Sequence, residues 1–294
     1  MLFPVLTISL MGFHIMIACF MGMKYLCDKK QLYLAPIAFA FTCSALLMLG
    51  TIGSYPDWLV CAQGREINQN DALIFYFFRN VMMAVLFITS IILYRIRHIT
   101  GHSRKIHGAV LSSCFIFITA TLILSWVHSS NSPLLSIEFI DNLTYTFTPL
   151  WHNRIGWLLI IIWSLTLILL IGLTRLRNIF WYSGAFFCTA YIFTLLVLLS
   201  TVSGNAHSWN QARLFETLST LFLILILLGD VFILYRESNE RYVRSYQNSI
   251  RDPLTRLYNR SYFYDTLTQR LSKASASQPL SVIVCDLDRF KRIN

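Results

Sequence analysis

Two carboxylates near the C-terminal end of the sequence have the residue type and spacing that suit a divalent cation. Asp286 and Asp288 are two residues apart and follow the apolar run 280–285, which is short and β-branched and predicts a central strand. Side chains two apart on a strand project to the same face. Mg²⁺ prefers oxygen ligands and commonly takes one or two carboxylates beside nucleotide phosphates. The pair indicates a magnesium site, although a D-x-D pair alone is also typical of a solvated strand end.

The residues around this pair form a longer pattern. Residues 251–260 read RDPLTRLYNR, and residues 281–294 read SVIVCDLDRFKRIN. Together they resemble the opening of a GGDEF domain, the catalytic domain of diguanylate cyclases. The family pattern is approximately D-x-L-T-G-L-x-N-R, then an apolar strand, then D-x-D-x-F-K-x-I-N-D. In this family two protomers each bind one GTP with Mg²⁺ and together form cyclic di-GMP.

The resemblance implies roles for individual residues of the nucleotide site. Asp286 would be the metal-binding aspartate, and the backbone carbonyl of Leu287 would be the neighbouring metal ligand. The backbone amides around Arg289 and Phe290 would contact the GTP phosphates, and Asn294 would hydrogen-bond the guanine edge.

The motif at 251–260 is expected to serve structure rather than chemistry. By resemblance, Asp252, Asn259 and Arg260 join a preceding signalling helix to the cyclase domain. Arg256 stands where the family usually has glycine, which weakens the turn without touching catalysis.

The printed sequence does not include the GG(D/E)EF turn that completes the family's active site. Phosphoryl transfer depends almost wholly on the metal and on positioned charge, so we expect this chain to be inactive by itself. We also expect that it is shortened at both ends.

One alternative to a diguanylate cyclase is a non-enzymatic membrane sensor that pairs with other GGDEF proteins. Another is a small transporter, favoured only by the number of spans and by charges within them.

The composition indicates a membrane protein. The chain is 56% hydrophobic and 13% charged, whereas an average soluble domain carries about 25% charge. Apolar runs of about 20 residues recur, the length that crosses a hydrocarbon core of roughly 30 Å. The net charge of +10 lies mostly in short loops between these runs. That distribution favours loops beside membrane lipid over a nucleic-acid partner.

We therefore predict a mainly α-helical, polytopic bundle followed by the first α/β segment of a GGDEF domain. The predicted domains are a transmembrane sensor (1–235), a cytoplasmic linker helix (236–251) and the N-terminal fragment of a GGDEF domain (252–294). The seven predicted spans are about 3–26, 34–55, 73–94, 109–127, 155–174, 179–200 and 213–235.

The basic residues predict the orientation of the spans. Alternate connections are rich in Lys and Arg, which is typical of cytoplasmic loops. They include Lys24, Lys29 and Lys30, the segment 95–105, Arg175 and Arg177, and the segment 236–251. The C-terminus is therefore predicted inside, and the resemblance implies a bacterial inner membrane.

The linker is predicted to be one polar helix. Residues 235–250 contain neither glycine nor proline, and Tyr235, Tyr242 and Ser249 recur every seven residues. This spacing indicates a marginal coiled coil, which by resemblance would form a homodimer together with the cyclase domain. Pro253 is expected to end the helix, and Asp252 is expected to cap a second helix at about 253–274.

Charged residues within the spans are candidates for the sensor site because their burial in a membrane is costly. Arg79, Asp230, Arg213 and Glu216 qualify. Arg213 and Glu216 are three apart on one helix face and can pair. The alternative is a pair at the membrane boundary whose ends reach the water.

Aromatic residues gather in the outer loops. Trp58, Trp126, Tyr145, Trp151 and Trp157 lie near the predicted membrane boundary, which is typical of an interfacial belt. The alternative is an aromatic-lined pocket, with Trp151 as a candidate, for an unknown small-molecule signal. The segments 70–79 and 209–216 resemble parts of the membrane-associated sensor (MASE-type) domains that precede GGDEF domains.

Overall fold

The computed structural model describes most of the chain. The described residues are 2–285, except for 56–67, 101–102, 131, 133–134, 136, 142–143, 145, 201–205 and 276–277. The side chains of residues 100 and 206–208 are also outside the description. The chain divides into two compact units, Met1–Asp230 and Val231–Asn294.

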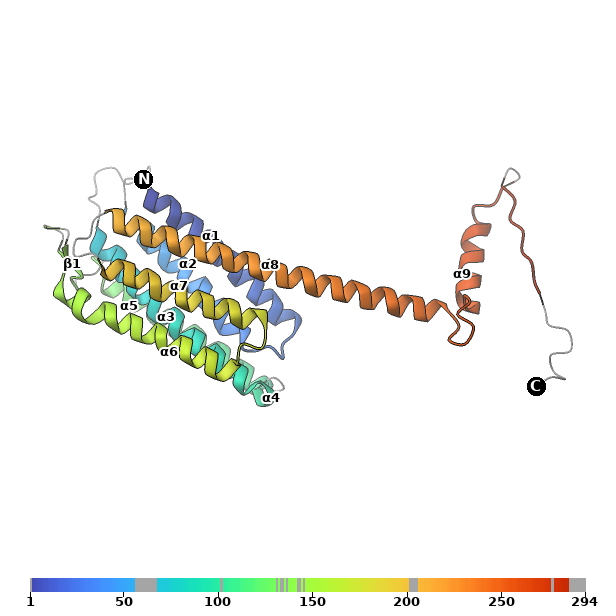
Figure 1. Cartoon of the computed structure of the whole chain (residues 1–294), viewed down its shortest axis with the longest axis horizontal. Helices are drawn as coiled ribbons and strands as arrows, with labels where there is room; N and C mark the ends of the chain where they lie inside the picture. Colours follow the sequence, from blue (N-terminus) through green and yellow to red (C-terminus); the bar gives the residue numbers. More distant parts are fainter. Residues whose placement is uncertain are drawn as a thin grey trace. The chain divides into compact units, whose positions relative to one another are not determined.

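The first unit is a bundle of long apolar helices (Figure 1). In the described part of the chain, seven helices are long and apolar enough to cross a membrane, which confirms the predicted spans. They are α1 (Leu2–Cys27), α2 (Leu34–Gly53), α3 (Gln69–Arg95), α5 (Arg104–Val127), α6 (Gly156–Thr174), α7 (Ile179–Leu199) and α8 (Ala206–Ile250). The short helix α4 (Arg97–Thr100) follows α3, and a π-helical turn η2 (Trp151–Ile155) leads into α6.

The helix α3 begins earlier than its apolar run because polar residues build its first turn. The Asn68 side chain accepts a hydrogen bond from the Asp71 backbone N–H at 3.1 Å, and such a cap satisfies a donor that has no partner within the helix. The span predicted at 73–94 therefore starts at Gln69.

The helix α3 lies at the centre of the bundle. It packs against α2, α5 and α6, and it is the most buried of the seven candidate spans. Its approach to α2 depends on Gly50, where an added Cβ would lie 2.7 Å from the Phe75 ring. A larger residue there would push the two helices apart.

Two hydrogen bonds between polar side chains join neighbouring helices of the bundle. The Trp163 indole N–H donates to Asn80 Oδ1 at 3.0 Å, and the His14 ring lies 2.8 Å from the Ser44 hydroxyl. Hydrogen bonds of this kind join neighbouring helices in a bilayer, where water is not available as a partner.

The connection between α5 and α6 is held against α3 by one amide side chain. Asn70 Oδ1 accepts from the backbone N–H groups of Phe139 at 2.7 Å and Ile140 at 3.1 Å. Its Nδ2 donates to the Ile137 carbonyl at 2.8 Å. These contacts position a small antiparallel pair, β1 (Ile140–Asp141) and β2 (Thr146–Phe147).

Asp71, next to Asn70, also binds the connection between α5 and α6. Asp71 accepts hydrogen bonds from the Ser130 backbone N–H at 2.9 Å and from the Ser130 hydroxyl at 2.5 Å. Asn70 and Asp71 open the segment 70–79 in which the sequence resembles a membrane-associated sensor, so two polar residues of that segment fasten the loop.

The second unit differs from the prediction in two places. The linker helix does end at Ile250, as part of α8, but the next helix, α9 (Arg260–Leu271), begins seven residues later than expected. Its N-cap is Asn259, which accepts from the Tyr262 N–H at 3.0 Å. The prediction that Asp252 caps this helix is wrong, because Asp252 closes the preceding turn instead.

The strand predicted at 280–285 is also wrong for the described residues. This segment is extended without strand hydrogen bonding, and Ile283 and Val284 are 86% and 88% exposed. A β-branched run forms a strand only beside a partner that pairs with its backbone. No such partner lies next to it in the described part of the unit.

Candidate functional site

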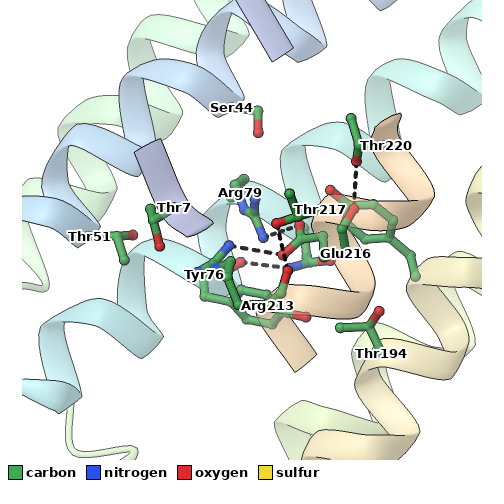
Figure 2. A network of polar contacts seen from close by, with 12 residues as sticks. Thr7, Ser44, Thr51, Tyr76, Arg79, Thr194, Arg213, Glu216, Thr217 and Thr220 are labelled. Atoms are coloured by element: carbon green, nitrogen blue, oxygen red, sulfur yellow. Dashed lines mark hydrogen bonds and ion pairs between the residues drawn. The ribbon is translucent and has the colours of Figure 1, made fainter. Parts of the chain in front are cut away.

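Three charged side chains meet inside the helix bundle. Glu216 Oε1 lies 2.5 Å from Arg79 Nη2, and Glu216 Oε2 accepts a hydrogen bond from Arg213 Nη1 at 2.9 Å. The exposed fractions of the three side chains are 2% for Arg79, 3% for Arg213 and 1% for Glu216. Figure 2 shows Glu216 between the two guanidinium groups. We call these residues the ionic triad.

The triad joins α3 to α8. Arg79 comes from α3, and the other two residues are three apart on α8, so they share one helix face. The predicted pairing of Arg213 with Glu216 is confirmed by this geometry. The alternative of a boundary pair that reaches the water is wrong, because all three side chains are buried.

Hydroxyl side chains of α8 satisfy the backbone beside the triad. The Thr217 hydroxyl donates to the Arg213 carbonyl at 2.7 Å, and the Thr220 hydroxyl donates to the Glu216 carbonyl at 2.8 Å (Figure 2). Side chains bonded back to their own helix present little polar surface of their own. The triad therefore supplies the charge at this point of the bundle.

Aromatic rings complete the surroundings of the two arginines. The Arg79 guanidinium lies 5.1 Å from the centre of the Tyr76 ring, and the Arg213 guanidinium lies 4.9 Å from the centre of the Phe3 ring. Trp209 packs edge-on against Phe3 at 5.7 Å. Cation–π contacts of this kind favour a buried positive charge.

A second ion pair holds α8 to α1. Lys24 Nζ lies 3.3 Å from Asp230 Oδ2, and the two side chains are 24% and 22% exposed. Asp230, predicted as an intramembrane charge, is therefore half-buried and paired. Its partner lies among the basic residues of the first predicted cytoplasmic connection.

Trp151 is buried, unlike Trp126 and Trp157, which are also predicted near the membrane boundary. Its ring is 0% exposed and packs against Phe139 and Phe147 at centroid distances of 5.4 and 6.3 Å. Trp126 and Trp157 are 54% and 53% exposed, as an interfacial belt requires. Trp58 and Tyr145 lie outside the described residues. Trp151 therefore packs against the connection between α5 and α6.

The turn after α8 is closed by the motif residues Asp252 and Asn259. Asp252 Oδ1 accepts from the Thr255 N–H at 2.8 Å and from the Thr255 hydroxyl at 2.9 Å. These bonds hold the pKa of Asp252 below its ordinary value. Asn259 Nδ2 donates to the Ser249 carbonyl at 2.6 Å, so this amide ties the end of α8 to the start of α9.

The three arginines at this turn and at the start of α9 differ in their contacts and backbone conformation. Arg251 Nη1 donates to the Arg256 carbonyl at 2.8 Å and packs over the Tyr258 ring. Arg256 itself has a φ of 61°, the left-handed region that favours glycine. Arg260 is the first residue of α9, and its guanidinium lies 5.5 Å from the centre of the Tyr264 ring.

The predicted nucleotide-site residues fall beyond the described part of the chain. Asp286, Leu287, Arg289, Phe290 and Asn294 all lie outside the described residues. By chemistry, the carboxylates at 286 and 288 are oxygen donors of the kind Mg²⁺ takes.

Sequence reasoning missed Tyr76, Asn70 and Trp209 as parts of these sites. Tyr76 and Asn70 are on the same helix as Arg79, and Trp209 precedes Arg213 by about one helical turn. The available signal was position: each lies one or two turns from a charge inside a span.

These features define a bundle of candidate membrane-spanning helices whose last helix continues into a second unit, and comparison with known proteins gives the family. Residues 1–235 match the MASE4 family, described as "Membrane-associated sensor, integral membrane domain". Residues 249–294 match the GGDEF family, described as "Diguanylate cyclase, GGDEF domain". The chain belongs to the MASE4 family of membrane-associated sensors and continues into a GGDEF domain.

A curated relative aligns with most of this chain. The probable diguanylate cyclase DgcT of Escherichia coli (strain K12) is 21% identical over 277 residues, which cover 94% of this chain and 59% of that protein. The aligned part thus spans less than two thirds of the relative's length. No solved structure matches this chain.

Proposed function

We propose that this chain is the sensor and the start of the catalytic domain of a membrane-bound diguanylate cyclase, which converts two GTP molecules to cyclic di-GMP. The observation that carries the proposal is the single helix α8, which holds two triad residues and continues to Ile250. The motif turn that follows it lies at the start of the GGDEF match. A change in the position of α8 at the triad could therefore be transmitted along the same helix to the cyclase domain.

The proposed orientation places the C-terminus in the cytoplasm of a bacterium, beneath its inner membrane. The basic connections support this orientation, and GTP is a cytoplasmic substrate. A cytoplasmic reporter fused after Ile250 is expected to be active. Activity of a periplasmic phosphatase fused at the same position would overturn the orientation.

The proposed nucleotide site uses the residues implied by the family pattern. Asp286 and the Leu287 carbonyl would hold Mg²⁺, which supplies positive charge to the triphosphate. The backbone at Arg289 and Phe290 would contact phosphate, and Asn294 would contact guanine. Homodimers formed through the linker helix and the cyclase domain would bring two GTP molecules together.

The chain of 294 residues is proposed to be inactive alone, because its sequence contains no GG(D/E)EF turn. Extending it after Asn294 with the remainder of a related cyclase domain should produce cyclic di-GMP from GTP and Mg²⁺. Asp286→Ala should abolish this activity, since it removes a metal ligand. Asp265→Ala, at an exposed position of α9, is the matched control and should retain it. Full activity of the Asp286→Ala protein would refute the assigned metal site.

A non-enzymatic sensor that pairs with other GGDEF proteins is the second candidate. It is favoured by the extent of the sensor match, which takes up residues 1–235. The two candidates separate in the extended chain: a protein that dimerises but makes no cyclic di-GMP supports the second.

A further inference from the structure

The ionic triad carries more positive than negative charge. Two guanidinium groups face a single carboxylate, so the triad has a formal charge of +1. An uncompensated charge within membrane-spanning helices is strongly unfavourable. A bound anion would neutralise it.

Hydrogen-bond donors beside the triad lack acceptors. Arg79 Nη1, the Tyr76 hydroxyl and the Trp209 indole N–H have no hydrogen-bond partner among the described residues. Tyr76 and Trp209 are each 5% exposed, so water from the surface does not satisfy them. Buried donors normally have partners, and each one without a partner is destabilising.

Two of these donors, the Tyr76 hydroxyl and the Trp209 indole N–H, line a cavity together with two members of the triad, Arg213 and Glu216. Its walls include Tyr76, Trp209, Arg213 and Glu216, with Phe3 and Leu198 on the apolar side. The volume open to the centre of a water molecule is about 10 Å³, close to the least that accommodates one water. The cavity therefore fits one small occupant of about the size of a water molecule, and a larger occupant requires its walls to move apart.

We propose that this cavity binds a small monovalent anion, a halide or a short carboxylate such as formate. One negative charge balances the triad, and the phenol and indole donors suit an anionic acceptor. Arg213 would then contact both the anion and Glu216, while Arg79 contacts Glu216 from α3. Since Arg79 belongs to α3 and Glu216 to α8, occupancy would change how tightly α8 is held.

The proposal deepens the sensor role and rests on the proposed function for its signalling consequence, but binding itself is measurable without GTP. The full chain in lipid nanodiscs would be heated in gluconate buffer, with gluconate replaced by chloride, nitrate or formate at constant ionic strength. We expect a saturable rise in Tm with one or more small anions. Chloride and formate arms distinguish a halide site from a carboxylate site.

Variants that keep the ring but remove one donor test the geometry. Tyr76→Phe and Trp209→Phe should each weaken the apparent affinity about tenfold, the effect of one hydrogen bond to a charged group. Tyr33→Phe and Trp126→Phe are matched controls away from the cavity and should bind as the unaltered chain does. Arg79→Gln removes the excess charge and should abolish the response.

Two outcomes would overturn the proposal. One is an identical Tm in gluconate, chloride, nitrate and formate, which would mean that the cavity holds water only. The other is an equal anion response in the donor variants, which would mean a general salt effect. Neither outcome bears on the cyclase assay of the extended chain, so the two proposals can fail separately.

Discussion

Glu216 of α8 and Arg79 of α3 form an ion pair with 1% and 2% of their side chains exposed. A buried pair contributes little net stability when intact, but loss of one partner leaves a charge in a medium that cannot solvate it. The carboxylate is the more critical member, since it contacts both guanidinium groups.

Glu216→Gln should therefore lower the free energy of unfolding by about 3–5 kcal/mol, the range for breaking a buried pair. Thermal unfolding of the full chain in nanodiscs measures the effect. Asp230→Asn is the control, because its pair with Lys24 is partly exposed and should contribute at most about 1 kcal/mol. Equal losses in both variants would contradict a special role for the buried triad.

Asn70→Ala should release the α5–α6 connection from α3. The change removes the acceptor of the Phe139 and Ile140 N–H groups, and each buried group left unpaired costs about 1–3 kcal/mol. Faster protease cleavage within 137–148 and a change in Trp151 fluorescence would report the release. Asn68→Ala removes only a helix cap, at about 1 kcal/mol, and should leave cleavage in the connection unchanged.

Arg256→Gly should stabilise the turn between α8 and α9. A non-glycine residue in the left-handed region is disfavoured by about 1–2 kcal/mol, whereas glycine loses about 0.5–1 kcal/mol more on ordering. The expected net gain is at most about 1 kcal/mol, seen as slower amide exchange at Asn259 and Leu257. Arg260→Gly, within a helix, should do the opposite. A gain from both changes would point to charge removal instead of backbone relief.

Protonation of Asp252 should loosen the same turn in acid. Because hydrogen bonds from Thr255 lower the pKa of Asp252 below 3.8 in the folded chain, the carboxylate stabilises the turn at every pH above that value. This stabilisation is lost as the pH falls from 3.8 through the lowered pKa. The protection factor of the Thr255 amide, measured by NMR relative to an unfolded peptide at the same pH, should fall only in that range. Asp252→Ala should have a low protection factor at all pH values, and a pH-independent protection factor in the wild-type chain would contradict the assignment.

The long elements could be predicted because their signal is local. A run of about 20 apolar residues is expected to be helical where it crosses a bilayer, so the seven candidate spans followed from composition alone. The pairing of Arg213 with Glu216 was predictable for the same reason, since both lie on one helix. Arg79 as the third member was not, because it is distant in sequence and reaches Glu216 only through packing of α3.

The wrong predictions near the C-terminal end also arise because the structure there depends on contacts that residue type alone does not reveal. Asp252 and Asn259 both suit a helix cap by residue type, and the choice between them depends on the turn that Arg251 and Thr255 close. The run 280–285 has strand composition, but composition does not provide a pairing edge.

Two ion pairs that join α8 to other helices have a mechanical consequence. Asp230 follows Glu216 by fourteen residues, about 21 Å along a helix, and each is fastened to a different neighbour, α1 and α3. A helix held at two heights resists both translation along its axis and rotation about it. If the Glu216 pair is weakened, only the pair at Asp230 still holds α8, and the helix can then tilt about that residue.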